Sequence, residues 1–257
     1  MTELLLWPNL VVLGFVFLYH LGLFVVRVIS EFWTMFSPLF FICKFPVPLL
    51  LAGTGLIAHY GNVIEETGPT GVDELPRPLR YLSWREDLWG PVVQVSFALL
   101  LCFWPIAVGQ WLPLEDAVYW CLIAALFLAG SIVVPATLLT TITSGPVANL
   151  RPDRVWAVMR TGGKRYLLLC ASWLAAAAIY GFGISESFDL IGDIDHANPI
   201  EPWQWPAALA ALIVGIYLMH WFCCQLGLYY RACHSRFPWL WQKFDKPPAP
   251  PPVPQHS

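Results

Sequence analysis

The chain has little charge for its length. Of its 257 residues only 12% are Asp, Glu, Lys or Arg, whereas 58% are hydrophobic. Soluble domains carry about 25% charged residues, so the composition argues against an ordinary soluble enzyme. The shortage of charge also excludes a disordered chain and a nucleic-acid-binding protein. What remains is a protein with several membrane-spanning helices.

The chain also lacks the short motifs of well-known enzyme classes. It contains no G-x-S-x-G, no H-E-x-x-H, no P-loop and no Rossmann glycine pattern. Its seven cysteines form no C-x-x-C pair, and most of them lie inside apolar runs. Neither a disulfide framework nor a zinc site is therefore expected. We predict no catalytic residue, no metal site and no enzymatic activity.

Six apolar stretches approach the roughly 20 residues that a helix needs to cross a bilayer. The second is the least regular, because Lys44, Pro46 and Pro48 interrupt its first half. It either crosses the membrane or re-enters on the same side, so five crossings are the alternative to six. We expect an all-α transmembrane helix bundle that forms a single domain over residues 1–245. The stretches are residues 4–26, 36–60, 91–112, 117–140, 166–184 and 205–228.

The few charges are sorted between alternate loops. All basic residues except Arg27 and Lys44 lie in three segments, and the two loops between these segments carry acidic residues but no Lys or Arg. Because basic loops stay in the cytoplasm, we expect the three basic segments and both termini to be cytoplasmic, in a bacterial inner membrane. The basic segments are residues 61–89, 144–165 and 231 onward, and the acidic loops are residues 113–116 and 185–204. Residues 246–257 form a proline-rich tail, for which we predict disorder.

Two of the basic segments have the pattern of an amphipathic helix that lies in the lipid headgroup layer. The first covers residues 79–89, and the second covers residues 152–160 with Val155, Trp156 and Met159 on one side. Such helices hold lipids or a partner protein, or they only anchor the loops. The residues predicted to contact lipids or a partner are Arg77, Arg80, Trp84, Arg85, Trp89, Arg154, Trp156 and Arg160.

Three histidines, His20, His59 and His220, fall within or near the predicted spans. Two histidines at the same depth on neighbouring helices can ligate a b-type haem, and ionisable groups inside the membrane can line a solute path. The predicted depths of the three histidines match poorly, and no cofactor is expected. A haem site, or a cavity that also includes Asn9 and Gln94, remains an alternative.

Several short motifs suggest a relationship to a known group. They are the predicted helix pair followed by Gly-Val-Asp-Glu-Leu-Pro at residues 71–76, the Trp84 and Trp89 stretch, and Ser-Gly-Pro at residues 144–146 followed by Arg-Val-Trp at residues 154–156. Over residues 40–235 the layout resembles an uncharacterised bacterial family of polytopic integral membrane proteins, a domain of unknown function. The resemblance implies a helical membrane fold and assigns no activity.

The expected function is that of a structural or assembly subunit of a membrane complex that binds lipids or other membrane proteins. Fourteen tryptophans, large apolar surfaces and the absence of charge at the span centres favour it. The first alternative is a transporter or channel for a small solute, and the second is a b-haem electron carrier. No nucleic-acid partner is expected.

Overall fold

The regular structure of the chain is helical throughout the residues that the computed structural model describes, and no strand occurs among them. The predicted all-α fold is thereby confirmed. The described residues are 7–36, 46–69, 75, 88–144, 150–192 and 203–237. The helices are α1 (Trp7–Phe36), α2 (Pro46–Thr67), α3 (Gly90–Gly109), α4 (Asp116–Thr143), α5 (Pro152–Gly162), α6 (Lys164–Gly192), α7 (Gln204–Cys233) and the 3₁₀ helix η6 (His234–Arg236).

Five of the described helices are long and apolar enough to cross a membrane: α1, α3, α4, α6 and α7. They support an integral membrane protein by length and composition. Helix α2 covers the second half of the predicted stretch at residues 36–60 and begins at Pro46. The choice between a crossing and a re-entrant segment depends on residues 37–45, which lie outside the described residues. The predicted tail at residues 246–257 also lies outside them.

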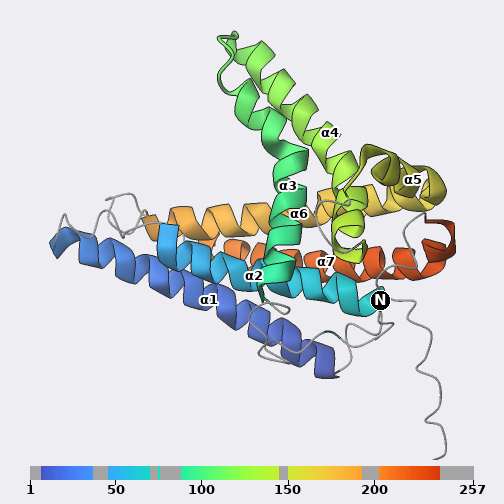
Figure 1. Cartoon of the computed structure of the whole chain (residues 1–257). Helices are drawn as coiled ribbons and strands as arrows, with labels where there is room; N and C mark the ends of the chain where they lie inside the picture. The colour runs from blue at the N-terminus through green and yellow to red at the C-terminus, as the bar shows by residue number, and fades with distance from the viewer. Residues whose placement is uncertain are drawn as a thin grey trace, which may run out of the picture.

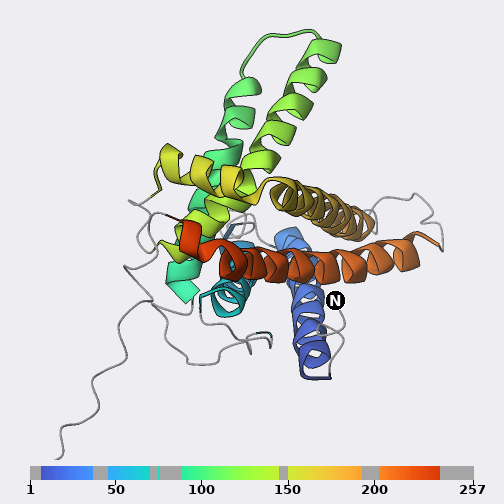
Figure 2. The same ribbon diagram turned by 90° about the vertical axis from the view of Figure 1, so that its right-hand side faces the viewer.

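Helices α1, α2, α6 and α7 form a bundle, and the α3–α4 hairpin crosses it (Figure 1). The most extensive helix pair is α6 with α7, and α7 packs on α2 as well. The outer half of the hairpin leaves the bundle and projects away from it, as Figure 2 shows from a second direction. The inner half of α4 lies in the bundle core, where Val134, Leu139 and Ile142 are buried.

Helices α6 and α7 approach closely because glycines face the opposite backbone. A Cβ atom on Gly215 would lie 2.5 Å from the Cα of Tyr180, and one on Gly183 would lie 2.6 Å from the backbone nitrogen of Leu212. Small residues at a helix contact let two backbones approach in a membrane, where no hydrophobic force drives helices together. The glycines therefore set the distance between these two helices.

The buried half of α4 contains several threonines, and their hydroxyl groups are satisfied within the helix. The hydroxyl of Thr140 donates to the carbonyl of Ala136 at 2.8 Å, and that of Thr143 donates to the carbonyl of Leu139. This back-bonding removes the cost of a bare polar group in an apolar core. These threonines can thus enter the core with their hydroxyl groups bonded inside the helix.

Candidate functional site

Helices α2 and α5 are both held against α7 near its C-terminal end. Gly68, just after α2, lies against α7: a Cβ atom on Gly227 would lie 2.8 Å from the backbone nitrogen of Gly68. Helix α5 is fixed to the same helix, because the hydroxyl of Tyr229 donates to the carbonyl of Val158 at 2.7 Å. We call this region, where α2 and α7 end and α5 meets α6, the basic end.

Helix α5 and helix α6 are joined at the basic end by two glycines. Gly163 has a φ of +49°, in the left-handed region where residues with a side chain are disfavoured. Gly162 has no room for a side chain, since a Cβ atom there would lie 2.7 Å from the Cβ of Tyr166. The turn therefore requires glycine at both positions, and it brings the start of α6 next to the end of α7.

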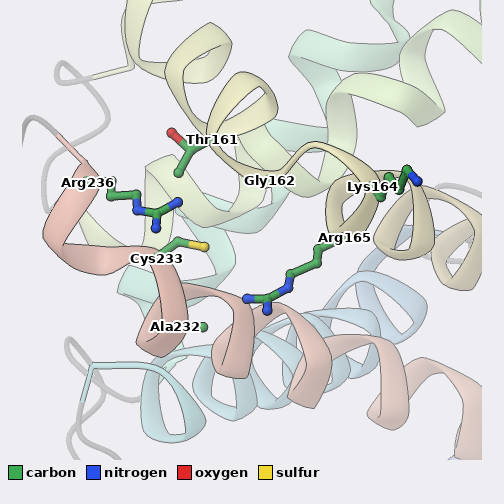
Figure 3. Close-up of a pocket in the computed structure, with 7 residues that line it drawn as sticks. All are labelled: Thr161, Gly162, Lys164, Arg165, Ala232, Cys233 and Arg236. Carbon is green, nitrogen blue, oxygen red and sulfur yellow. The ribbon is translucent and has the colours of Figure 1, made fainter.

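A pocket of about 320 Å³ lies between this turn and η6. Figure 3 shows the guanidinium groups of Arg165 and Arg236 directed toward the space beside Cys233, with Thr161 on the opposite side, whereas the side chain of Lys164 turns away. We call this space the basic pocket. It is lined by Thr161, Gly162, Lys164, Arg165, Ala232, Cys233 and Arg236.

The positive charge of the basic pocket is not neutralised within the part of the chain that the structure describes. Lys164, Arg165 and Arg236 form no ion pair with a described carboxylate. The ion pair between Arg151 and Asp153, with a distance of 3.0 Å, lies on the surface at the start of α5. Two arginines that face one space with no described carboxylate beside them favour an anionic ligand.

The second predicted interfacial helix corresponds to α5, but its faces differ from the prediction. Val155, Val158 and Met159 pack against the protein core. Trp156 points away from the core and is 63% exposed. Grouping Trp156 with Val155 and Met159 was therefore wrong: the apolar face of α5 holds it to the bundle and leaves the tryptophan outside.

Of the other predicted interface residues, three are described by the structure and four are not. Trp89, which precedes α3, is 56% exposed, and Arg160 on α5 is exposed as well. Arg154 on α5 is partly buried. The remaining four lie outside the described residues: Arg77, Arg80, Trp84 and Arg85.

A cluster of three buried histidines and two partly buried tyrosines lies inside the bundle. The Nε2 atoms of His59 on α2 and His220 on α7 are 2.9 Å apart. The hydroxyl of Tyr180 on α6 donates to the Nε2 of His20 on α1 at 2.6 Å. The ring of Tyr60 lies between the two pairs, 5.0 Å from the ring of His220 and 6.4 Å from that of Tyr180 between centroids. We call these five residues the His–Tyr cluster.

Hydrogen bonds to backbone carbonyls show which ring nitrogen carries the proton in His20 and His220. The Nδ1–H of His220 donates to the carbonyl of Ile216 at 2.8 Å, and the Nδ1–H of His20 donates to that of Val16 at 2.7 Å. A neutral imidazole with its proton on Nδ1 has an acceptor at Nε2. We therefore assign the Nε2–H donor of the histidine pair to His59.

The expectation that the three histidines lie at different depths is wrong for His59 and His220, which touch. Their separation of 2.9 Å suits a direct hydrogen bond. Two nitrogens on opposite sides of a metal ion lie about 4 Å apart, because each metal–nitrogen bond is about 2.0 Å long. A haem iron would thus require the two rings to separate, and an absorption spectrum tests the haem hypothesis.

Asn9, a predicted cavity residue, holds a backbone group outside the His–Tyr cluster. Asn9 is buried near the start of α1, about three turns before His20. Its Oδ1 accepts a hydrogen bond from the backbone nitrogen of Leu75 at 2.9 Å. Asn9 therefore holds the backbone of Leu75, a role that its place in an apolar run did not reveal.

Sequence reasoning missed the basic pocket and the tyrosines. Lys164 and Arg165 follow Gly162 and Gly163 directly, a signal for a turn with cations beside it. Nothing in the local sequence indicates that Arg236 closes the same space, because it lies about 70 residues further along the chain.

Comparison of the chain with protein-family models, with curated proteins and with solved structures gives no match. The resemblance to the uncharacterised bacterial membrane family therefore stays a prediction.

Proposed function

We propose that the protein is a non-enzymatic integral membrane subunit that binds lipids and other membrane proteins. The observation that carries the proposal is the outer half of the α3–α4 hairpin, residues 103–129, which we call the hairpin arm. Gly109 is the one buried residue in this range, every position of which is described. The exposed large apolar side chains of the arm are Trp104, Val108, Trp111, Leu112, Leu114, Val118, Trp120, Phe127 and Leu128.

The hairpin arm is held together as a pair of helices. The rings of Phe103 and Phe127 stack with centroids 5.6 Å apart. A Cβ atom on Gly130 would lie 2.6 Å from the carbonyl oxygen of Cys102, so the helices meet closely at the base of the arm. Its outward side chains are therefore free to contact lipid or a neighbouring protein. A large exposed apolar surface of this kind is typical of a membrane or protein interface.

The basic end supports the same proposal. Its cations belong to segments that the positive-inside rule places in the cytoplasm, next to the anionic headgroups of the inner leaflet. Trp156 on α5 is exposed beside them, and tryptophan is enriched at membrane interfaces. We place the basic end, and both termini, on the cytoplasmic side of a bacterial inner membrane.

Photo-crosslinking from the hairpin arm tests the proposal. A photoreactive phenylalanine analogue replaces Trp104, which is 53% exposed, in the full chain in its membrane. The matched control carries the same analogue at Phe103, which stacks on Phe127. We expect Trp104 to yield adducts with lipid or a second protein, and Phe103 to yield links within the chain. If both positions gave the same internal products, the proposal would be wrong.

A second candidate function is the transport of a small solute or a proton, which the His–Tyr cluster favours. Ionisable groups inside a membrane protein frequently mark a transport path. The test uses liposomes that contain the full chain and a trapped pH-sensitive dye. Transport of protons predicts faster dye response than in protein-free liposomes, and loss of that response in His220→Phe. Equal rates with and without the protein would contradict proton transport.

A further inference from the structure

The strongest unexplained feature is the convergence of two guanidinium groups in the basic pocket. Arg165 comes from the start of α6 and Arg236 from η6, and both face the space beside Cys233 (Figure 3). Neither is paired with a described carboxylate. Like charges in one pocket repel each other unless an anion lies between them, so the pocket is suited to an anionic ligand.

The planar guanidinium fork favours a particular anion. It matches the oxygen geometry of carboxylates and phosphates, with which arginine forms paired, charge-assisted hydrogen bonds. A phosphate has oxygens directed to more than one side, so one group can contact Arg165 and Arg236 together. Lys164, whose side chain turns away in Figure 3, adds positive charge at the rim.

The surroundings of the basic pocket favour a lipid as the source of the phosphate. Leu168 lies three residues after Arg165, on the same face of α6, and is 69% exposed. Leu228 lies four residues before Ala232 on α7 and is 48% exposed. Each lies one turn from the pocket toward the apolar part of its helix. A cationic pocket with exposed leucines directly beneath it suits a headgroup above and acyl chains below.

We infer that the basic pocket binds the phosphate group of an anionic phospholipid headgroup. The inference rests on the proposed function, and it adds the headgroup chemistry and the residues that recognise it. The contacts come from the guanidinium groups of Arg165 and Arg236, and the acyl chains lie along Leu168 and Leu228.

The test measures the unfolding midpoint of the full chain in a zwitterionic detergent, from its intrinsic tryptophan fluorescence. A ligand that binds the folded state raises this midpoint. Phosphatidylglycerol is added in one series, and phosphatidylcholine and inorganic phosphate are added in two others. The variant is the double substitution Arg165→Gln with Arg236→Gln. The matched control is Arg151→Gln with Arg231→Gln, which removes the same charge at two exposed positions that do not line the pocket.

We expect phosphatidylglycerol to raise the midpoint of the original chain and of the control, and phosphatidylcholine to raise it much less. The pocket variant is expected to need about tenfold more phosphatidylglycerol for the same shift, since it loses two charge-assisted contacts. Arg165→Lys with Arg236→Lys keeps the charge and is expected to fall between the two. If the glutamine variant does not fold, the lysine variant is compared with the control in its place.

Three results would overturn the inference. Equal shifts in the pocket variant and the control would show that general surface charge binds the lipid. A shift of the same size with inorganic phosphate would show that the pocket takes a soluble anion. No shift with any addition would show that it binds neither. The proposed function fails separately, on the crosslinks from Trp104.

Discussion

At the scale of single residues, the Tyr229 hydroxyl has the clearest structural role at the basic end. It donates to the carbonyl of Val158, and both residues are buried. Replacing Tyr229 with Phe leaves that carbonyl without its partner and should cost about 1 kcal/mol of stability. The check is a lower unfolding midpoint in detergent, followed by tryptophan fluorescence.

The control for this substitution lies on the same helix. Tyr217→Phe removes a hydroxyl from a partly exposed tyrosine that makes no hydrogen bond within the described residues. It should leave the midpoint unchanged. Equal effects of the two substitutions would mean that the Tyr229 hydrogen bond does not hold α5 to α7.

The histidine pair gives a second prediction at this scale. His59→Phe and His220→Phe should each lower stability, because each leaves a buried imidazole nitrogen without its 2.9 Å partner. The double substitution should cost less than the sum of the single ones. We expect a coupling energy of about 0.5–1.5 kcal/mol, the range of hydrogen bonds between membrane helices. Strictly additive effects would show that the two rings do not interact.

At the scale of helices, the contact between α6 and α7 depends on glycine. Gly215→Ala places a Cβ atom 2.5 Å from the backbone of Tyr180, and overpacking of this kind costs about 1–3 kcal/mol. Gly181→Ala is the matched control, because its Cβ atom would meet nothing within 4 Å. Unfolding midpoints should fall for Gly215→Ala and stay the same or rise for Gly181→Ala. The opposite order would contradict the packing described for these helices.

Helix positions could be predicted from the sequence, because hydropathy and turn residues act locally. The long apolar runs correspond to α1, α3, α4, α6 and α7, and Pro152 with Asp153 marks the start of α5. Which face of α5 is buried could not be predicted from the sequence in the same way. Trp156 and Val158 are both apolar, and their opposite positions depend on where α7 lies.

Contacts between segments that lie far apart in the sequence could not be predicted from it. His59 and His220 touch because α2 packs on α7, and their depths estimated from span ends were too imprecise to show it. The same holds for Arg165 and Arg236, which meet only once α6 and α7 are placed. Pairing of helices is decided by small residues and side-chain fit, which local composition does not record.

At the scale of the whole molecule, the described chain combines a bundle with an arm. The bundle of α1, α2, α6 and α7 contains the His–Tyr cluster, and the basic pocket lies at one end of it (Figure 1). The hairpin arm is inclined steeply to α6 and α7 in both views (Figure 2). An arm that projects from the bundle is well placed to reach neighbouring lipid or protein.

The most direct test of the proposed subunit role is the mass of the intact particle. The full chain is extracted from its membrane in mild detergent and measured by native mass spectrometry. We predict a mass above the 29.0 kDa of the chain, through retained phospholipid, a second protein or both. A bare particle of 29.0 kDa, with neither lipid nor partner, would contradict the proposed function.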